Sequence, residues 1–311
     1  MFFDPVNINK KNDRAFHTVT FKALGSKNKL LLYCDDLARL KEASEAVVKE
    51  TKRIEKKYSR YNLQSDLSRV NQSAGIKSCI VDKEFCELFN YAEICFIESD
   101  GLFDITLGIL RNVWDWKSKQ PPHKQKITKL LDSIGWDKVE WNSLNQTIYL
   151  PNKNMQIDFG GIGKEYAVDR ARKILEEYGI ENGVIDFAGD IFVLGPHLDG
   201  TAWKVAIAHP RNEQQVISNI DIKKGGLATS GDYERYFIYE GKRYYHLLNP
   251  STGYPTENPF QSVSVVAKSC LEAGSMASIA MLKGYSEGLS WLRKSGVSFL
   301  AINPDGKILS D

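Results

Sequence analysis

The chain has 311 residues, of which 42% are hydrophobic and 26% are charged, values that are ordinary for a globular protein. Its formal net charge of +2 at pH 7 argues against a nucleic-acid partner, whose binding needs clustered Lys and Arg. Five cysteines, an odd number without a C-x-x-C pair, predict neither a disulfide framework nor a zinc site, and the apolar surroundings of Cys86, Cys95 and Cys270 indicate core thiols.

The N-terminal stretch, MFFDPVNINKKNDRAF, contains no apolar run as long as that of a signal peptide, and no later segment reaches transmembrane length. We therefore expect a cytoplasmic protein without a membrane-spanning segment. Residues 15–22 and 28–35 are predicted to form two β-strands around the turn Ala23-Leu24-Gly25-Ser26, whose glycine permits a positive φ.

Residues 36–58 carry apolar side chains at helical spacing with charges between them, a pattern that predicts an amphipathic surface helix. The polar segment SRYNLQSDLSRVN (59–71) follows, where Ser65 or Asp66 caps the next short helix or belongs to a binding site. A further helix is expected over 83–98, and it ends at Asp100-Gly101.

Apolar and polar residues alternate from Phe103 to Leu107 within the segment 101–116, which is typical of a strand end or turn beside a hydrophobic wall. Trp114 and Trp116 are predicted to serve packing. Residues 117–127 are basic and contain proline, so we expect an exposed loop, and His123 within it receives no role.

The segment MQIDFGGIGKEYAVDRAR (155–172) predicts a short buried strand, a glycine turn and a helix that begins near Lys164. Backbone N–H groups of such a turn can approach an anion closely, and the helix N-terminus and Lys164 add positive charge. The spacing is neither that of a Walker loop nor that of a dinucleotide-binding fingerprint. From these residues alone the segment is either a phosphate site or a tight connection with a surface lysine.

Strands are predicted beyond this segment at 184–195, 203–210, 233–239, 242–248 and 262–267. Asp186 and Asp190 interrupt the apolar run 184–195, and because an unpaired buried carboxylate is costly, at least one of them should face a site. Glu240-Gly241 predicts a hairpin between two of the strands. His246 is then either a satisfied core histidine or an acid/base residue.

A helix is expected over 270–284, followed by a second helix and a strand. Small residues form one face of the first helix, which permits close packing or the close approach of a ligand; they are Gly274, Ser275, Ala277 and Ser278.

Six blocks occur in the order and rough spacing of one known family: SRYNLQSDLSRVN, GLFDITLGIL, IDFGGIGKEYAVDRA, FAGDIFVLG, LATSGDYERYF and HLLNPSTGYP. Through them the chain resembles the ApbE family, the FAD:protein FMN transferases, over about residues 18–300. The resemblance implies an α+β, T-fold-like architecture of antiparallel sheets with packed helices. It also implies a single domain over residues 1–311, with FAD in a cleft between two lobes.

The resemblance further implies a transferase that uses Mg²⁺ to cleave FAD, attaches FMN to a threonine hydroxyl of a target protein, and releases AMP. Carried over residue by residue, FAD would lie among Leu24, Tyr61, Leu102, Phe103, Asp104, Asp158, Lys164 and the backbone near Leu248. Tyr61 would pack against an aromatic ring system, and Lys164 would meet the pyrophosphate. The carbonyl of Gly161 and the hydroxyl of Ser278 would ligate Mg²⁺. His246 is the hypothesised base for the threonine hydroxyl, or an electrostatic partner of the phosphate.

The sequence departs from the family pattern at three places. Ala23-Leu24-Gly25-Ser26 stands where the family usually reads Met-Gly-Thr, Ala188 where it usually has glycine, and Gly274 where it usually has an aspartate that binds Mg²⁺. Loss of that charged ligand weakens Mg²⁺ binding unless another carboxylate enters the coordination sphere. Glu165 is our candidate for this replacement carboxylate. Alternatively, Glu165 is an ordinary residue of the first helical turn, where the helix dipole favours a negative charge.

Two functions follow from these departures. The first is an active Mg²⁺-dependent flavin transferase. The second is a metal-poor FAD-binding protein that serves as a flavin carrier or sensor, or that only hydrolyses FAD as a pyrophosphatase.

Overall fold

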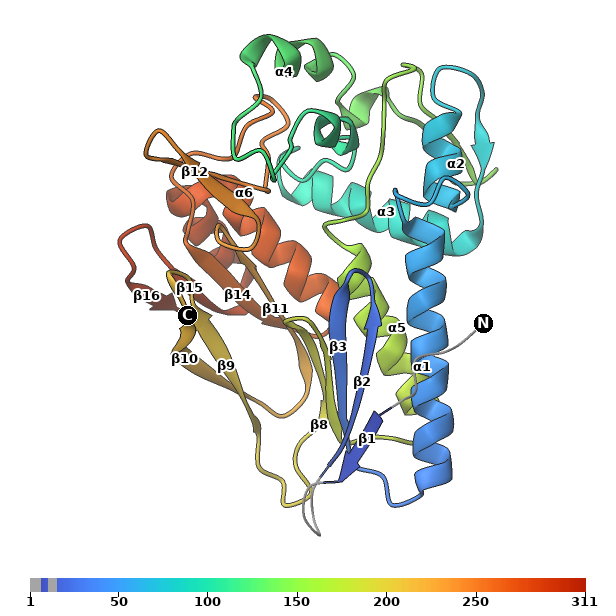
Figure 1. The fold of residues 1–311 in the computed structure, drawn as a ribbon, viewed down its shortest axis with the longest axis vertical. Helices are drawn as coiled ribbons and strands as arrows, with labels where there is room; N and C mark the ends of the chain where they lie inside the picture. Colours follow the sequence, from blue (N-terminus) through green and yellow to red (C-terminus); the bar gives the residue numbers. More distant parts are fainter. Residues whose placement is uncertain (1–6, 11–15) are drawn as a thin grey trace.

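The computed structural model describes residues 7–10 and 16–311 of the chain (Figure 1). We predicted no signal peptide in the N-terminal stretch 1–16, and most of this stretch lies outside the described part. Ala15, the first residue of the first predicted strand, also lies outside it. No helix among the described residues is both long and apolar enough to cross a membrane.

A nine-stranded sheet forms the centre of the fold, and each pair of neighbouring strands in it is antiparallel. Together with the helices packed on it, this sheet confirms the predicted α+β class. In spatial order its strands are β1 (Asn7–Lys10), β2 (His17–Ala23), β3 (Ser26–Leu32), β7 (Gly183–Phe187), β8 (Asp190–Gly195), β11 (Gly225–Gly231), β14 (Ser262–Ala267), β15 (Ser298–Ile302) and β16 (Ile308–Ser310).

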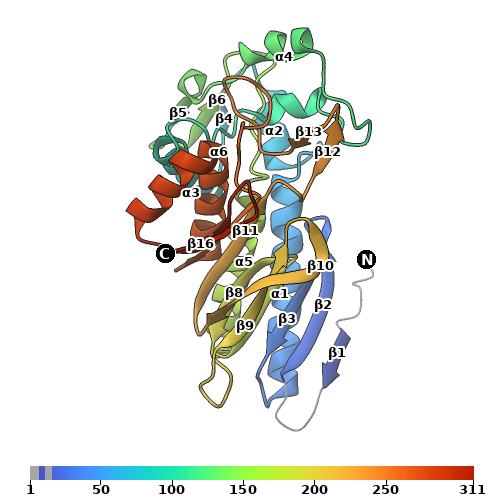
Figure 2. The ribbon, with the colours of Figure 1, turned by 90° about the vertical axis from the view of Figure 1, so that its left-hand side faces the viewer.

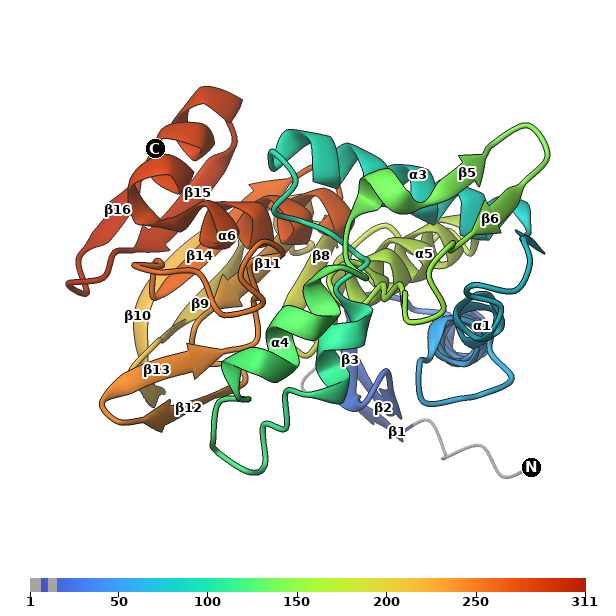
Figure 3. The same ribbon diagram turned by 90° about the horizontal axis from the view of Figure 1, so that it is seen from above.

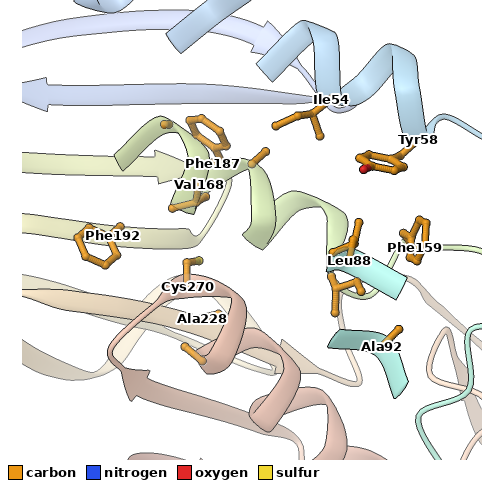
Figure 4. Packing of buried hydrophobic residues seen from close by; sticks show 14 of the residues in the cluster. Ile54, Tyr58, Leu88, Ala92, Phe159, Val168, Phe187, Phe192, Ala228 and Cys270 are labelled. Carbon is orange, nitrogen blue, oxygen red and sulfur yellow. The ribbon is translucent and has the colours of Figure 1, made fainter. Parts of the chain in front are cut away.

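Three long helices cover one face of the sheet: α1 (Leu37–Tyr58), α5 (Gly163–Glu177) and α6 (Cys270–Ser295). Seen from above, they follow one another across the molecule (Figure 3). The side chain of Asp36 caps α1 by accepting hydrogen bonds from the backbone N–H groups of Ala38 and Arg39. Figure 4 shows the core beneath these helices, where Ile54 lies near Phe187 of the sheet and Tyr58 packs against Phe159.

The hairpin of β9 (Trp203–His209) and β10 (Asn212–Ile222) covers the opposite face of the sheet (Figure 2). Because successive side chains of a strand point to opposite faces, a strand between two apolar layers is apolar throughout. In β15, Phe299 and Ala301 belong to the helix-side core, whereas Leu300 and Ile302 pack with Trp203 on the hairpin side. Both faces of the sheet are therefore buried at β15, whereas alternate residues of β2 and β3 remain exposed.

A smaller layer lies over one end of the sheet, at the top of Figure 1. Its members are α2 (Asp66–Gln72), α3 (Lys83–Glu98), α4 (Lys124–Leu131), the 3-10 helices η1 (Gly108–Asn112) and η2 (Trp136–Lys138), and a small sheet of β4 (Cys79–Ile80), β6 (Thr147–Tyr149) and β5 (Glu140–Asn142). The hairpin of β12 (Tyr236–Tyr239) and β13 (Lys242–Tyr245) shares a third apolar cluster with η1 and α4.

Predictions that depended on local signals are confirmed. The helices expected over 36–58 and 83–98 are α1 and α3, and Ser65 caps α2 by accepting a hydrogen bond from the N–H of Ser68. The helix that begins at 270 is interrupted at Gly284, where a second helix was expected to follow. All five cysteines are buried and free, and the burial of Cys86, Cys95 and Cys270 was predicted.

Other predictions were wrong. Alternate residues of 155–159 are buried, as in a strand, but the segment does not form one in the described part of the chain. Its β-type pairing there is an isolated bridge between Gln156 and Leu107. The region 101–116 contains turns and η1, so the predicted turn is confirmed there and the alternative of a strand end is wrong. Residues 117–127 are not wholly a loop, because α4 begins at Lys124. The hairpin expected over 233–248 has the predicted turn but shorter strands.

The strands β10 and β11 were not predicted. The strand Gly225–Gly231 is made mostly of small residues, and its three glycines have low strand propensity. The structure gives the reason for this composition, because a Cβ atom on Gly226 would lie 2.4 Å from the backbone of Ser269 and Cys270. The small residues of β11 let the start of α6 pack closely on the sheet.

Candidate active site

A cleft of about 910 Å³ lies where hairpin tips at the end of the central sheet meet the loops of the smaller layer. It brings together every residue that the sequence assigned to a site: Leu24, Tyr61, Leu102, Phe103, Asp104, Asp158, Gly161, Lys164, His246, Leu248 and Ser278. Glu165 also lines the cleft. Its volume is near the upper end for ligand pockets in proteins, so it can hold a large organic molecule.

Two hairpin tips form one border of the cleft. Leu24 and Gly25 connect β2 to β3 with φ angles of 56° and 71°, and Ala188 and Gly189 connect β7 to β8 with φ angles of 52° and 96°. Two-residue hairpin turns with positive φ match the twist of the strands, but only glycine adopts them without strain. The turns thus bring backbone and the Leu24 side chain to the cleft.

Asp186 and Asp190 have different roles on the second hairpin. Asp186 Oδ1 accepts a hydrogen bond of 2.9 Å from the N–H of Gly189 and so stabilises the turn. Asp190 is buried, lines the cleft and forms an ion pair with Lys164, with 2.8 Å between Oδ2 and Nζ. Burial raises the pKa of Asp190, and the ion pair opposes that shift.

The glycine turn brings the N-terminus of α5 to the cleft. Gly163 donates its N–H to the carbonyl of Phe159 at 2.7 Å, and the ring of Phe159 packs edge-on against Tyr58. A Cβ atom on Gly160 would lie 3.0 Å from both Asp158 and Arg111, and one on Gly161 would lie 3.0 Å from the ring of Phe103. Glycine thus lets the turn approach the cleft wall closely, whereas a Cβ atom at either position would require the wall side chains to shift.

Asp158 holds two arginines in the cleft. Its Oδ2 pairs with Arg60 and, at 2.7 Å, with Nε of Arg111, while its Oδ1 accepts a hydrogen bond from the N–H of Gly160. Arg60 also lies over the ring of Tyr61, 4.7 Å from its centroid, and the Tyr61 side chain is 82% exposed. Burial lowers the pKa of Arg111, and Asp158 opposes that shift.

The apolar wall of the cleft is built from several segments. Leu102 and Phe103 lie on it with Leu248, and Trp114 and Trp116 stack on each other with ring centroids 5.0 Å apart. Asp104 is buried beside this wall, where its Oδ1 accepts hydrogen bonds from the N–H and the hydroxyl of Thr106. Asp104 therefore shapes the turn that presents Phe103.

Hydroxyl groups lie where β11 meets α6. The Oγ atoms of Ser230 and Ser278 are 2.8 Å apart, and both residues line the cleft. Among the described residues there is no cluster of three or more His, Cys, Asp or Glu side chains that could hold a metal ion. The oxygen donors are instead these hydroxyls, the Gly161 carbonyl and separate carboxylates, which are donors of the kind that Mg²⁺ takes.

Glu165 follows Lys164 in the first turn of α5. Its Oε2 atom is buried and has no hydrogen-bond partner in the described part of the chain. Burial, and after it the negative charge of Asp190, raises the pKa of Glu165 to about 8. Gly274 of α6 packs against this side chain and does not itself line the cleft.

His246 follows β13 and enters the cleft from the side of the β12–β13 hairpin. Burial, followed by the charges of Arg235, Arg111 and Lys164, lowers its pKa to about 4. Its Nδ1 atom is buried without a hydrogen-bond partner among the residues that the structure describes. The imidazole is therefore neutral near pH 7 and can accept a proton.

Sequence reasoning assigned no site role to several residues that line the cleft: Arg60, Arg111, Ser230, Glu234 and Arg235. Arg60, Ser230 and Arg235 lie in polar segments that the sequence singled out, and Asp190 was one of two candidates. No local signal marked Arg111, because its partner Asp158 is distant in the chain.

The comparisons with known proteins agree in family and fold. A family model described as the ApbE family matches residues 19–301. The chain is 30% identical over 252 residues to the FAD:protein FMN transferase of Vibrio cholerae, which covers 78% of this chain and 74% of that protein. It is 28% identical over 274 residues to the enzyme of the same name from Haemophilus influenzae, covering 85% and 78% of the two chains.

Solved structures show the same fold. The crystal structure of the ApbE protein of Thermotoga maritima matches with a TM-score of 0.86 and 28% identity, covering 95% of this chain and 97% of that one. The flavin transferase ApbE of Vibrio cholerae matches with a TM-score of 0.82 over 99% of this chain and 98% of that one. At 23% identity, this second likeness supports the fold alone.

Proposed function

This chain belongs to the ApbE family, and from that membership we propose that it is an FAD:protein FMN transferase. The observation that carries the proposal is that one cleft combines an apolar wall, a cationic helix N-terminus and a neutral histidine. The apolar wall suits a flavin ring, and the cationic helix N-terminus suits a pyrophosphate. The neutral histidine can take the proton of a hydroxyl nucleophile. We propose that residues 1–311 act as one functional domain.

FAD binding in this proposal uses both borders of the cleft. Leu24, Leu102, Phe103 and Leu248 would enclose aromatic rings, and the exposed ring of Tyr61 would pack on one of them. Lys164 and the N–H groups at the start of α5 would receive the pyrophosphate. Asp158 and Asp104 would act mainly as supports, since Asp158 fixes two arginines and Asp104 fixes the turn at Phe103.

We propose that the carbonyl of Gly161 and the hydroxyl of Ser278 hold Mg²⁺. In phosphoryl transfer this ion supplies charge neutralisation at the phosphate oxygens. Hydroxyl and carbonyl oxygens suit such a hard cation, and Ser278 lies beside a second hydroxyl, that of Ser230.

The transfer step is a substitution at phosphorus. The threonine oxygen of the target protein bonds to the phosphorus of the FMN half, the bond from that phosphorus to the bridging oxygen breaks, and AMP leaves. We propose that His246 takes the threonine proton at Nδ1 while Nε2 carries the ring hydrogen. Because the cleft keeps the imidazole neutral, this base is available at neutral pH.

Mass spectrometry of a threonine-containing acceptor domain, incubated with the protein, FAD and Mg²⁺, tests the proposal. We expect the acceptor to gain one FMN moiety, EDTA to abolish the gain, and His246→Gln to slow transfer by roughly a hundredfold or more without loss of FAD binding. FAD that binds without ever being transferred, across several acceptors, would favour the flavin carrier or pyrophosphatase instead. Release of AMP without an acceptor would identify the pyrophosphatase.

A further inference from the structure

Glu165 and Gly274 fit each other sterically where α5 crosses α6. A Cβ atom built on Gly274 would lie 2.6 Å from Cγ of Glu165, 2.9 Å from its Oε1 and 3.1 Å from its Cδ. Real Cβ atoms do not approach other heavy atoms to 2.6 Å, so any larger residue at position 274 would displace the Glu165 side chain. The absence of a side chain at Gly274 is what admits the side chain of Glu165.

The carboxylate of Glu165 is turned into the protein and incompletely paired. Its Oε2 atom is buried and accepts no hydrogen bond from any described residue, while the neighbouring Lys164 directs its ammonium group to Asp190 at 2.8 Å. An unpaired buried carboxylate oxygen is costly, whereas an ordinary glutamate in the first turn of a helix faces solvent. The buried Oε2 atom of Glu165 thus requires a partner, whereas a surface glutamate would be solvated by water.

Ser278 lies one helical turn beyond Gly274 on α6, and residues four apart in a helix share a face. A carboxylate that covers Gly274 therefore lies on the face of α6 that carries Ser278. Glu165, Ser278 and Gly161 line the same cleft. Together they offer a carboxylate, a hydroxyl and a carbonyl oxygen.

We propose that Glu165 is the charged oxygen ligand of the divalent cation in this cleft, and that Gly274 is a glycine because it must admit that ligand. The proposal rests on the proposed function, since it identifies a further residue that would bind the metal of the same reaction. It predicts that one carboxylate is needed in this space and that it can come from position 165 or from position 274, but not from both.

Metal affinity tests the proposal without relying on turnover. Mn²⁺ is titrated into the full chain and followed by electron paramagnetic resonance, with Mg²⁺ as the competitor. We expect Glu165→Gln, which keeps the shape of the side chain but replaces the carboxyl group by an amide that cannot ionise, to weaken Mn²⁺ binding by roughly tenfold or more. Glu177→Gln, the same change at an exposed position of α5, should leave the Mn²⁺ affinity unchanged.

Moving the carboxylate provides the sharper test. Gly274→Asp alone should lower the melting temperature because its side chain collides with Glu165. Glu165→Ala combined with Gly274→Asp should restore both the melting temperature and the Mn²⁺ affinity to within about threefold of the original protein. If Glu165→Gln is too unstable to titrate, Glu165→Asp, which draws the carboxylate back by one methylene, should show a smaller loss of Mn²⁺ affinity.

Different outcomes would overturn the role of Glu165 and the transferase function. Wild-type Mn²⁺ affinity in Glu165→Gln, or no recovery in the double variant, overturns the role of Glu165 and leaves the transferase proposal standing. An original protein that binds Mn²⁺ but neither binds FAD nor transfers FMN overturns the proposed function.

Discussion

His246 is kept neutral by its surroundings, since burial and three nearby cations lower its pKa to about 4. A neutral imidazole can accept a proton from a hydroxyl, whereas an imidazolium cannot. The same environment makes the histidine a source of pH-dependent stability, because an unfolded chain returns its pKa to about 6.5.

The sign of this dependence follows from proton binding. Below pH 6.5 the unfolded chain binds a proton that the folded protein does not, so the contribution of His246 is fully present above pH 6.5 and is lost as the pH falls toward 4. The loss reaches on the order of 3 kcal/mol. In urea unfolding across this range, His246→Gln should lose less stability than the original protein, and the exposed control His123→Gln should not differ from it. Parallel curves for His246→Gln and the original protein would contradict the shifted pKa.

Ala188 adopts a φ of 52° at a hairpin tip of the cleft, a conformation that costs an L-residue about 1 kcal/mol. Ala188→Gly should therefore raise the free energy of unfolding by up to about 1 kcal/mol, and the gain is reduced by the greater entropy of glycine in the unfolded chain. Gly189→Ala, next to it at a φ of 96° with no atom within 4 Å of the added Cβ, should destabilise for conformational reasons alone. Chemical denaturation of both variants measures the difference, and a destabilised Ala188→Gly would show that the methyl group itself packs.

At the scale of elements, α6 depends on a single break. Gly284 has φ 75° and ψ 176°, a region that only glycine populates readily, and it lets the helix change course after its first half has packed on β11 and β14. The N–H of Tyr285, which follows the break, donates to the carbonyl of Asn258.

Gly284→Ala should therefore lower the free energy of unfolding by about 2 kcal/mol, because the helix must distort or adopt the strained conformation. Gly296→Ala, at the left-handed C-cap of the same helix with open space around it, should cost about 1 kcal/mol. Equal costs at the two positions in thermal or urea unfolding would show that the break at Gly284 carries no additional strain.

At the scale of the whole molecule, the cleft joins the central sheet to the smaller layer. Its lining residues run from Leu24 near the start of the chain to Leu282 in α6, and the structure unites them only when both layers are packed together. A ligand in this cleft therefore binds the folded protein and not its unfolded chain, and binding shifts the folding equilibrium.

FAD should consequently stabilise the protein by mass action. At a hundred times its Kd, FAD should raise the free energy of unfolding by about 2.7 kcal/mol. Lys164→Met removes the cation at the N-terminus of α5, so it should weaken FAD binding by roughly tenfold and lose about 1.4 kcal/mol of that stabilisation at the same FAD concentration. Denaturation of the original protein and of Lys164→Met, each with and without FAD, measures both effects. If FAD raised the free energy of unfolding equally in the two proteins, the pyrophosphate would not bind at Lys164.

Much of the fold was visible in short stretches of sequence. Asp36 and Ser65 mark the starts of helices, and Glu240-Gly241 marks a hairpin, because caps and turns act through groups only a few residues apart. The small residues of Gly225–Gly231 gave no such signal. Small side chains are needed there because α6, which comes later in the chain, packs closely against this strand.

The ordered motifs of the sequence were sufficient to predict the α+β class, the family and many of the residues that line the cleft, although not Arg111. The pairing of the cleft residues with one another follows from the packed structure alone. Asp158 meets Arg60 across 98 positions of sequence, Lys164 meets Asp190, and Glu165 fills the space above Gly274. Ion pairs and steric fit depend on distances between side chains of separate elements, and packing of the elements sets those distances.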